Sequence, residues 1–214
     1  MTNFLNKECL FQMTKFLITP SLLSSYSYYI QDEWKSPEDS RTDFLNTLSR
    51  EKFKSNEAQQ RGLDFEQHIM ELTNNLPSSF NDKEEPYIEN VINIANIVRG
   101  GLWQQSVKKD IKIGNQEFLL YGHTDVIKRD TVYDIKFTGN YELGKFIDSS
   151  KHLIYLYCSD LPNFSYLISD GKDWWEEDYH NHDGVEREIK SKIADFMSYL
   201  ENDLEAKEMF LTKW

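Results

Sequence analysis

The stretch YGHTDVIKRDTVYDIKF, residues 121–137, predicts two short strands joined at Arg129 and Asp130. If the chain reverses symmetrically about the bond between these two residues, Asp125 on the first strand faces Asp134 on the second. Cross-strand neighbours have Cβ atoms about 5 Å apart, and like charges in such positions destabilise a sheet. The two facing acids therefore indicate that another group compensates their charges.

Lys136 is one candidate for that compensation. Side chains alternate between the two faces of a strand, so Lys136 projects from the same face as Asp134. Tyr133, Ile135 and Phe137 project from the other face, which we expect to lie against the hydrophobic core. Lys136 could take part in chemistry, but an ordinary salt bridge to Asp125 or Asp134 is an equally direct interpretation.

A third carboxylate comes from a helix predicted over residues 60–76, whose apolar residues recur at spacings of three and four. At 100° per residue, Glu66 falls on the apolar edge of this helix, where a carboxylate needs a partner. Hard cations such as Mg²⁺ bind carboxylates and water, and a divalent ion would relieve the repulsion between the aspartates. We therefore predict a metal site with Glu66, Asp125 and Asp134 as ligands and the backbone carbonyl of Ile135 within reach. A glutamate at the rim of the core, paired with a lysine, is the simpler alternative for Glu66.

The length and the order of elements predict the fold class. The 214 residues are enough for one domain with a buried core. The expected order of helices, sheet, helix, strand and helix indicates an α/β or α+β domain with the acids on its sheet. We expect one domain over residues 1–214, with a helical part over 1–58, a catalytic core over 59–170, and a loop and helix over 171–214.

The individual elements follow from periodicity, caps and turn residues. Helices are expected over 21–33, 44–54, 60–76, 88–99, from Asp148 or Ser149 onward, and over 185–204. A meander of three or four strands is expected from Val107 to Phe137, and a further strand over 164–169. We expect loops over 36–43 and over the acidic, aromatic segment 170–184.

The charge is strongly negative but unevenly distributed. The chain has a net charge of −12, which opposes nonspecific attraction to nucleic acid or anionic membrane. Residues 99–151 contain nine Lys or Arg against seven Asp or Glu, so this segment is +2 and the remainder is −14. The basic segment is either a binding face or an ordinary solvated surface.

The remaining composition indicates a cytoplasmic protein. Cys9 and Cys158 are far apart and form no CxxC pair, so neither a disulfide framework nor a zinc or iron–sulfur site is expected. No run of about 18 apolar residues is present to span a membrane, and the first residues lack the features of a signal peptide. We therefore expect a reducing, intracellular environment and no membrane partner.

Four motifs resemble those of a known family. GLDFE, GHTD, DIK and SSKHLIYLY are similar, in this order, to the motifs of the RecB-type branch of the PD-(D/E)XK nuclease superfamily, which includes phage lambda-type exonucleases and nucleases of CRISPR adaptation. The resemblance covers about residues 19–169, because ITPSLLSSYSYY also resembles the N-terminal helix of that family. It implies a restriction-endonuclease-like core, in which helices flank a central mixed sheet.

The resemblance also implies roles for single residues. Asp125 and Asp134 match the metal ligands, Lys136 matches the catalytic lysine, and Glu66 occupies a position held by histidine or glutamate. Two further residues, Lys151 and Tyr155, match the Q-x-x-x-Y helix motif, with lysine in place of the usual glutamine. The cysteines that bind an iron–sulfur cluster in some members are missing, so no cluster is expected.

The function implied is hydrolysis of DNA phosphodiester bonds by an exonuclease-like enzyme that depends on Mg²⁺ or Mn²⁺. The expected substrate is linear or single-stranded DNA, and the resemblance leaves room for a protein partner in recombination or repair. The residues expected to contact DNA are Lys108, Lys109, Lys145, Lys151 and Tyr155. An acidic interaction protein on an inactive nuclease scaffold is the alternative, supported by the −14 outside the central segment, and a purely structural module is a third.

Overall fold

The computed structural model describes residues 15–31, 36–51, 56–75 and 87–214 of the chain. Its helices are α1 (Pro20–Gln31), α2 (Pro37–Ser49), α3 (Glu57–Thr73), α4 (Ile88–Val98), α5 (Ser150–Ser159), α6 (Val185–Asn202) and α7 (Leu204–Lys213). Its strands are β1 (Phe16–Ile18), β2 (Leu102–Trp103), β3 (Ser106–Ile113), β4 (Gln116–His123), β5 (Val126–Lys128), β6 (Thr131–Phe137), β7 (Asn163–Ser169) and β8 (Trp174–His180). The expected mixed α/β class is confirmed.

The strands form two sheets rather than the single meander expected from the sequence. One sheet has the order β1-β4-β3 and the other the order β2-β5-β6-β7-β8. The chain passes from the first sheet to the second at Thr124 and Asp125, between β4 and β5. The amide of Thr124 donates to the carbonyl of Gln105, and the carbonyl of Asp125 accepts from the amide of Gln104. These bonds fix the junction, so Asp125 stands where the two sheets meet.

The hairpin of β5 and β6 has the register predicted from the sequence. Val126 pairs with Tyr133, Ile127 with Val132, and Lys128 with Thr131. The two-residue turn forms although Arg-Asp is not a preferred turn pair, because Arg129 adopts the left-handed region with φ of 53°. The ladder ends at Val126, so Asp125 lies beside the hairpin and is not a paired strand residue.

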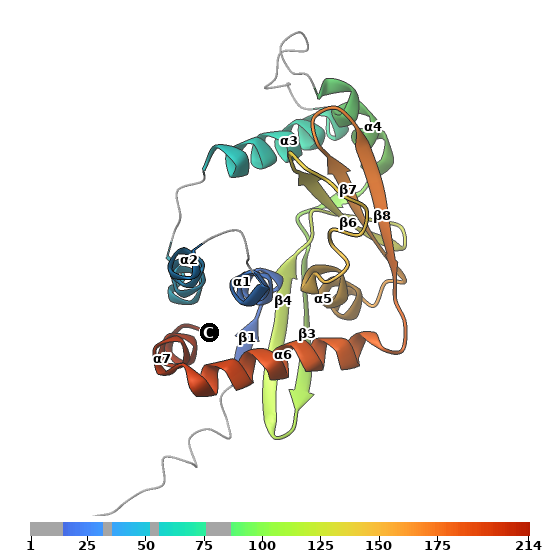
Figure 1. The fold of residues 1–214 in the computed structure, drawn as a ribbon. Coiled ribbons are helices and arrows are strands. Elements are labelled where there is room, and N and C mark those ends of the chain that lie inside the picture. The colour runs from blue at the N-terminus through green and yellow to red at the C-terminus, as the bar shows by residue number, and fades with distance from the viewer. Residues whose placement is uncertain (1–14, 32–35, 52–55, 76–86) are drawn as a thin grey trace, which may run out of the picture.

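Both faces of β6 are covered, although only one was expected to be. Ile135 packs with Phe65 and Ile69 of α3 on one face. Val132, on the other face, packs with Tyr155 of α5. Asp134 belongs to the row of Val132, so its carboxylate is buried on the face that Tyr155 of α5 also contacts; in the view of Figure 1, α5 lies between β4 and β8.

The described elements differ from the expected ones in several places. The short strand β2 and the last helix α7 were not expected, since one helix over 185–204 was predicted where α6 and α7 follow each other. Helix α2 begins inside the segment expected to be a loop, because the Ser36 side chain caps the amide of Asp39 and Pro37 takes the first helical position. Strand β8 lies inside the expected loop 170–184 and pairs antiparallel with β7. Strand β1 was not expected, and it pairs parallel with β4. Two helices end earlier than expected: α2 ends at Ser49, where Arg50 adopts the left-handed conformation, and α3 ends at Thr73. The expected helix end at Glu33 lies outside the described residues, as does Cys9.

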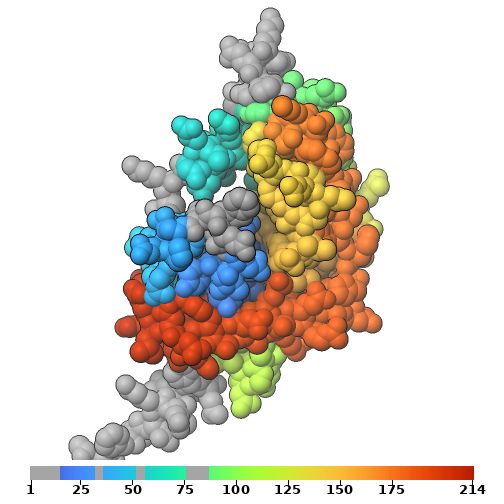
Figure 2. All heavy atoms as spheres, in the orientation of Figure 1, coloured from blue at the N-terminus to red at the C-terminus, as the bar shows by residue number. Residues whose placement is uncertain are grey.

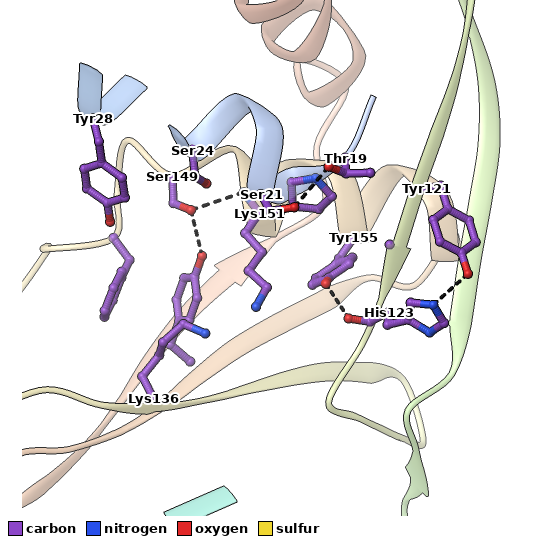
Figure 3. Close-up of a pocket in the computed structure, with 14 residues that line it drawn as sticks. Thr19, Ser21, Ser24, Tyr28, Tyr121, His123, Lys136, Ser149, Lys151 and Tyr155 are labelled. Atoms are coloured by element: carbon purple, nitrogen blue, oxygen red, sulfur yellow. Dashed lines mark hydrogen bonds between the residues drawn. The ribbon is translucent and has the colours of Figure 1, made fainter. Parts of the chain in front are cut away.

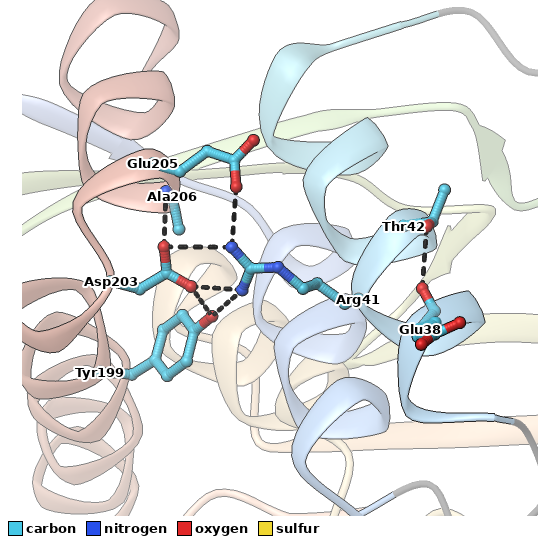
Figure 4. A network of polar contacts seen from close by, with 7 residues as sticks. All are labelled: Glu38, Arg41, Thr42, Tyr199, Asp203, Glu205 and Ala206. Atoms are coloured by element: carbon cyan, nitrogen blue, oxygen red, sulfur yellow. Dashed lines mark hydrogen bonds and ion pairs between the residues drawn. The ribbon is translucent and has the colours of Figure 1, made fainter.

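A polar network joins the N-terminal helices to the C-terminal ones (Figure 4). Arg41 of α2 forms ion pairs with Asp203, at the start of α7, and with Glu205 at 2.8 Å. Tyr199 of α6 donates to Asp203 at 2.6 Å. The two helices at the end of the chain are thereby fixed against α2, so α1 is held between α2 and α6. None of the described helices is long and apolar enough to cross a membrane.

Candidate active site

Asp134 is the centre of the site. Its side chain has no solvent exposure, and each of its oxygens forms one ion pair: Oδ1 with Lys151 of α5 and Oδ2 with Lys136 of β6. Neither oxygen accepts a hydrogen bond of regular geometry from any other group among the described residues. The ordinary salt bridge considered for Lys136 is therefore present. It leaves a chemical role for this lysine open, because the pair lies at the edge of a pocket.

Asp125 and Glu66 lie beside this pair of lysines. Asp125 is 8% exposed, and its Oδ2 accepts a hydrogen bond of 2.7 Å from the backbone amide of Ile135. Glu66, on α3, is half-buried, and its Oε1 accepts a hydrogen bond of 2.7 Å from Gln104 Nε2. Three carboxylates from a helix, a sheet junction and a strand thus lie close enough to influence one another's charge.

The pKa values show that the three acids share one electrostatic environment. Burial raises the pKa of Asp125 to about 7, and the negative charge of Asp134 adds to this effect. The pKa of Glu66 is also raised, first by burial and then by Asp134. Burial acts in the same direction on Asp134, but Lys136 and Lys151 outweigh it and hold the pKa of Asp134 below its usual value. The acids without a lysine partner are therefore the ones that resist ionisation.

A pocket of about 410 Å³ adjoins the two lysines (Figure 3). Hydroxyl-bearing side chains from the start of α1 and from α5 line much of it, together with aromatic rings. Its lining residues include Thr19, Ser21, Ser24, Tyr28, His123, Phe146 and Ser149 besides the two lysines. Figure 2 shows this face of the molecule hollowed between α1, α3 and the segment that joins β6 to α5. The two lysines line this pocket, whereas the fully buried Asp134 does not.

Tyr155 positions the end of β4 relative to the site. Its ring is buried, and its hydroxyl donates to the backbone carbonyl of His123. Gly122 allows this contact, because a Cβ there would lie 2.5 Å from Cε1 of Tyr155. The His123 ring, in turn, lies within hydrogen-bond distance of the Tyr121 hydroxyl, at 2.6 Å from Nε2. Tyr155 is thus a structural residue in this arrangement, and its expected contact with DNA stays a prediction.

The other lysines expected to bind DNA do not lie together. Lys108 is exposed and pairs with Tyr121 in the β3–β4 ladder, so it shares the face of a residue that lines the pocket. Lys109 forms an ion pair of 2.5 Å with Asp160 and lies over the ring of Tyr157. Lys145 donates to Thr138 Oγ1 at 3.0 Å, within its own loop. None of these three lysines is among the residues that line the pocket.

The side chains of the site carry the kinds of ligand atom that a divalent cation binds, but they are not arranged around a common point. Within the ranges that the structure describes, no three His, Cys, Asp or Glu side chains are grouped so that they could hold a metal ion. The oxygens of Asp134 face Lys136 and Lys151, and the Ile135 carbonyl lies 3.5 Å from Lys136 Nζ. Carboxylate and carbonyl oxygens are the ligands that Mg²⁺ and Mn²⁺ take. The oxygens of Asp134 are therefore of a type that could bind a divalent cation in place of the ammonium groups. Because the three carboxylates are not grouped around one point in this structure, the expected ligand set stays a prediction.

Two residues of the site were missed in the sequence. Gln104 donates a hydrogen bond to Glu66, and its backbone adopts the left-handed region with φ of 52°. No residue pattern in the sequence predicts this conformation of Gln104. Tyr166 pairs with Asp134 across the parallel ladder, and its ring lies 6.0 Å from Lys136 Nζ. Tyr166 could have been found, because it lies in the predicted strand 164–169 that a parallel sheet would place beside β6.

The comparisons with known proteins bear on the fold. No protein-family model and no curated protein sequence matches the chain. The crystal structure of SSO0001 aligns with 87% of this chain and 77% of its own, with a TM-score of 0.52 and 12% identity. The structure of LHK-Exo in complex with dAMP aligns with 92% of this chain and 93% of its own, with a TM-score of 0.49 and 14% identity. A phage related exonuclease from Haemophilus somnus 129PT aligns with 94% of this chain and 96% of its own, with a TM-score of 0.35 and 11% identity. At these identities the comparisons concern the fold alone, and the chain shares its fold with SSO0001.

Proposed function

We propose that this protein is a nuclease that hydrolyses phosphodiester bonds of DNA and depends on Mg²⁺ or Mn²⁺. One observation carries the proposal: two lysines from different elements converge on the fully buried carboxylate of Asp134, beside two further carboxylates and at the edge of a pocket. A structural ion pair needs only one lysine. The two additional acids have raised pKa values and no lysine partner among the described residues, and such acids suit a site that binds a cation.

Each residue of the site has a role in this proposal. Glu66, Asp125 and Asp134 would hold the cation, with the Ile135 carbonyl as a further ligand. A bound Mg²⁺ or Mn²⁺ supplies polarisation of the scissile phosphate and a lower pKa for the attacking water. Lys136 projects from the same strand face as Asp134, so its ammonium group can orient that water or hold charge on the phosphate. Residues 59–170 would form the catalytic core within a single domain.

The pocket determines the kind of substrate in this proposal. Its hydroxyl groups and two lysines offer donors to phosphate oxygens, and Tyr28, 69% exposed at its rim, offers a face for a base. These features suit an unpaired strand, because stacking on a side chain requires an accessible base. We therefore expect linear DNA with an accessible end, or single-stranded DNA, to be cleaved in preference to closed circular duplex.

The test is incubation of the purified protein with end-labelled linear DNA and with closed circular DNA, in Mg²⁺, Mn²⁺ or EDTA. We expect release of label from linear DNA with either cation and none in EDTA. Asp134→Asn should abolish the release, whereas Asp110→Asn should not, because Asp110 pairs with Lys15 away from the site. Failure of the wild type to cut any DNA or RNA would favour the acidic interaction protein, whose support is the charge of the flanking segments.

A further inference from the structure

Lys151 connects the buried carboxylate with the pocket. It stands in the first turn of α5, its Nζ pairs with Oδ1 of Asp134, and its side chain also lines the pocket (Figure 3). Lys136 pairs with the other oxygen, Oδ2. Each oxygen of this buried carboxylate therefore has one ammonium partner, and a cation that uses Asp134 as a ligand must compete with an ammonium group.

The charge of the site leads to the same conclusion. With all groups ionised, Glu66, Asp125, Asp134, Lys136 and Lys151 carry a net charge of −1. A bound divalent cation changes this to +1 and places a double charge beside two ammonium groups. Like charges in a poorly solvated site repel strongly, so binding requires one ammonium to leave the carboxylate. The site with its cation then has an excess positive charge that an anion would neutralise.

Lys151 is the lysine that can leave. Lys136 lies two residues from Asp134 on the same face of β6, so its ammonium stays near the carboxylate, with the Ile135 carbonyl 3.5 Å away as a second acceptor. Lys151 reaches Asp134 from a different element, and its Nζ lies 5.7 Å from the centroid of the Tyr155 ring. A change of its rotamer would move the ammonium from the carboxylate into the pocket that it already lines.

The pocket can receive an ammonium but does not neutralise it. Hydroxyl groups of Thr19, Ser21 and Ser149 can accept hydrogen bonds there, and no Asp or Glu is among the described residues that line the pocket. A phosphate group of a nucleic acid strand would supply the missing negative charge. Lysine binds phosphate as a compact point charge without strict geometric requirements.

We propose that Lys151 is an exchangeable counterion of this site. It pairs with Asp134 in the cation-free protein, and cation binding releases it into the pocket, where it binds a phosphate group of the strand. The exchange rests on the proposed function, since it uses the same cation and the same class of substrate. It makes cation binding and phosphate binding mutually favourable, and this coupling is reciprocal by thermodynamic necessity.

Calorimetric titration with Mn²⁺ tests the first half of the exchange. Lys151→Gln keeps a polar side chain but removes the competing ammonium, so Mn²⁺ should bind about tenfold more tightly than to the wild type, within the usual range of coupling between sites. Lys136→Gln should give a smaller gain, and Lys190→Gln, which removes a lysine paired with Glu186 on α6, should give none. Unchanged or weaker Mn²⁺ binding by a folded Lys151→Gln would overturn the exchange.

Binding of a short fluorescein-labelled oligothymidine tests the second half. Measured by anisotropy, the wild type should bind it about tenfold more tightly in Ca²⁺ than in EDTA. Lys151→Gln should lose most of this difference, and Lys151→Arg, which keeps the charge, should retain it. Equal enhancement by Ca²⁺ in the wild type and in Lys151→Gln would overturn the exchange.

The two experiments separate this inference from the proposed function. If the wild type binds Mn²⁺ and cuts DNA while Lys151→Gln shows unaltered cation affinity and coupling, the exchange is wrong and the nuclease stands. If neither the wild type nor Lys151→Gln binds Mn²⁺, both the metal site and the exchange are wrong. Circular dichroism of each variant verifies that a lost effect does not come from a lost fold.

Discussion

Lys151 on α5 and Asp134 on β6 form an ion pair that joins a helix to the buried centre of a sheet. Burial alone would lower the pKa of Lys151, but the charges of Asp134 and Asp125 outweigh it and raise that pKa well above its ordinary value. The lysine is therefore charged at neutral pH, and so is its partner. Asp134 differs in this respect from Asp125, although the two acids stand side by side.

This difference predicts opposite effects of two similar substitutions in the absence of metal. Asp134→Asn leaves two ammonium groups without their partner, so the free energy of unfolding should fall by about 3 kcal/mol. Asp125→Asn removes a charge that burial disfavours, and the amide oxygen can still accept from the Ile135 amide. Urea unfolding in EDTA at about pH 8 should therefore show Asp134→Asn as less stable and Asp125→Asn as more stable than the wild type.

The pH dependence of stability in the wild type and in Asp125→Asn supplies a control. The folded pKa of Asp125, about 7, is above its unfolded value of 3.8, so the native state binds more protons in this window. The wild type therefore loses the contribution of Asp125 to its stability as the pH rises from about 4 to about 7. Asp125→Asn does not titrate at this position, so it does not undergo this loss over the same range. The advantage of Asp125→Asn should hence shrink as the pH is lowered to about 5. An advantage that grows on acidification would contradict the raised pKa.

Lys136 separates binding from chemistry. The carboxylates and the Ile135 carbonyl can ligate a cation without it, so Lys136→Met should keep Mn²⁺ binding and most DNA affinity. The rate of DNA cleavage should drop by roughly 10²-fold or more, the scale of a lost acid–base or electrostatic group. Single-turnover cleavage of labelled DNA measures the rate, with Lys190→Met as the matched control. A variant that cleaves at the wild-type rate would remove Lys136 from the mechanism.

Two glycines predict opposite effects of one added methyl group. A Cβ at Gly122 would lie 2.5 Å from the buried Tyr155 ring, so Gly122→Ala should lower the free energy of unfolding by about 1–3 kcal/mol. Gly62 lies inside α3, and a Cβ added there would have no neighbouring atom within 4 Å, so Gly62→Ala should raise that free energy by about 0.5–1 kcal/mol. Thermal or urea unfolding of both variants checks the pair. Equal effects would mean that Tyr155 adjusts freely.

His152 predicts a loss of stability in mild acid. Its ring is buried, stacks on Tyr179 at a centroid distance of 3.9 Å, and has no hydrogen bond at Nδ1 within the described structure. Burial, together with Lys192 and His182, lowers the pKa of His152 from 6.5 to about 4. The unfolded chain therefore binds more protons between these values, and stability is lost as the pH falls through them, by about 3 kcal/mol in total.

The variant His152→Phe keeps an aromatic ring at this position and removes the titration. Its free energy of unfolding, relative to that of the wild type, should rise steadily as the pH is lowered from about 6.5 to about 4. Other groups titrate in this range, but they are common to both proteins and cancel in the difference. A difference that stays constant with pH would show that His152 does not cause the loss of stability in acid.

The sequence alone determined the parts of this protein that depend on neighbours along the chain. Alternation along 121–137 predicted the hairpin register and the shared face of Asp134 and Lys136, because strand period and turn position define both. Helical periodicity likewise predicted α4 within one residue and placed Glu66 at the edge of the apolar face of its helix, where it is half-buried. In each case the relevant residues are few positions apart, so local geometry sufficed.

The tertiary structure decided what depends on segments far apart in the chain. The break between two sheets at Asp125, the cover of α5 over Asp134, and the pairing of Lys151 with that acid follow from how distant elements pack. No periodicity encodes them, because burial and the resulting pKa of a carboxylate depend on everything packed around it. The sequence therefore singled out the acids as candidates, and only the tertiary structure determined that Asp134 is the one held ionised by two lysines.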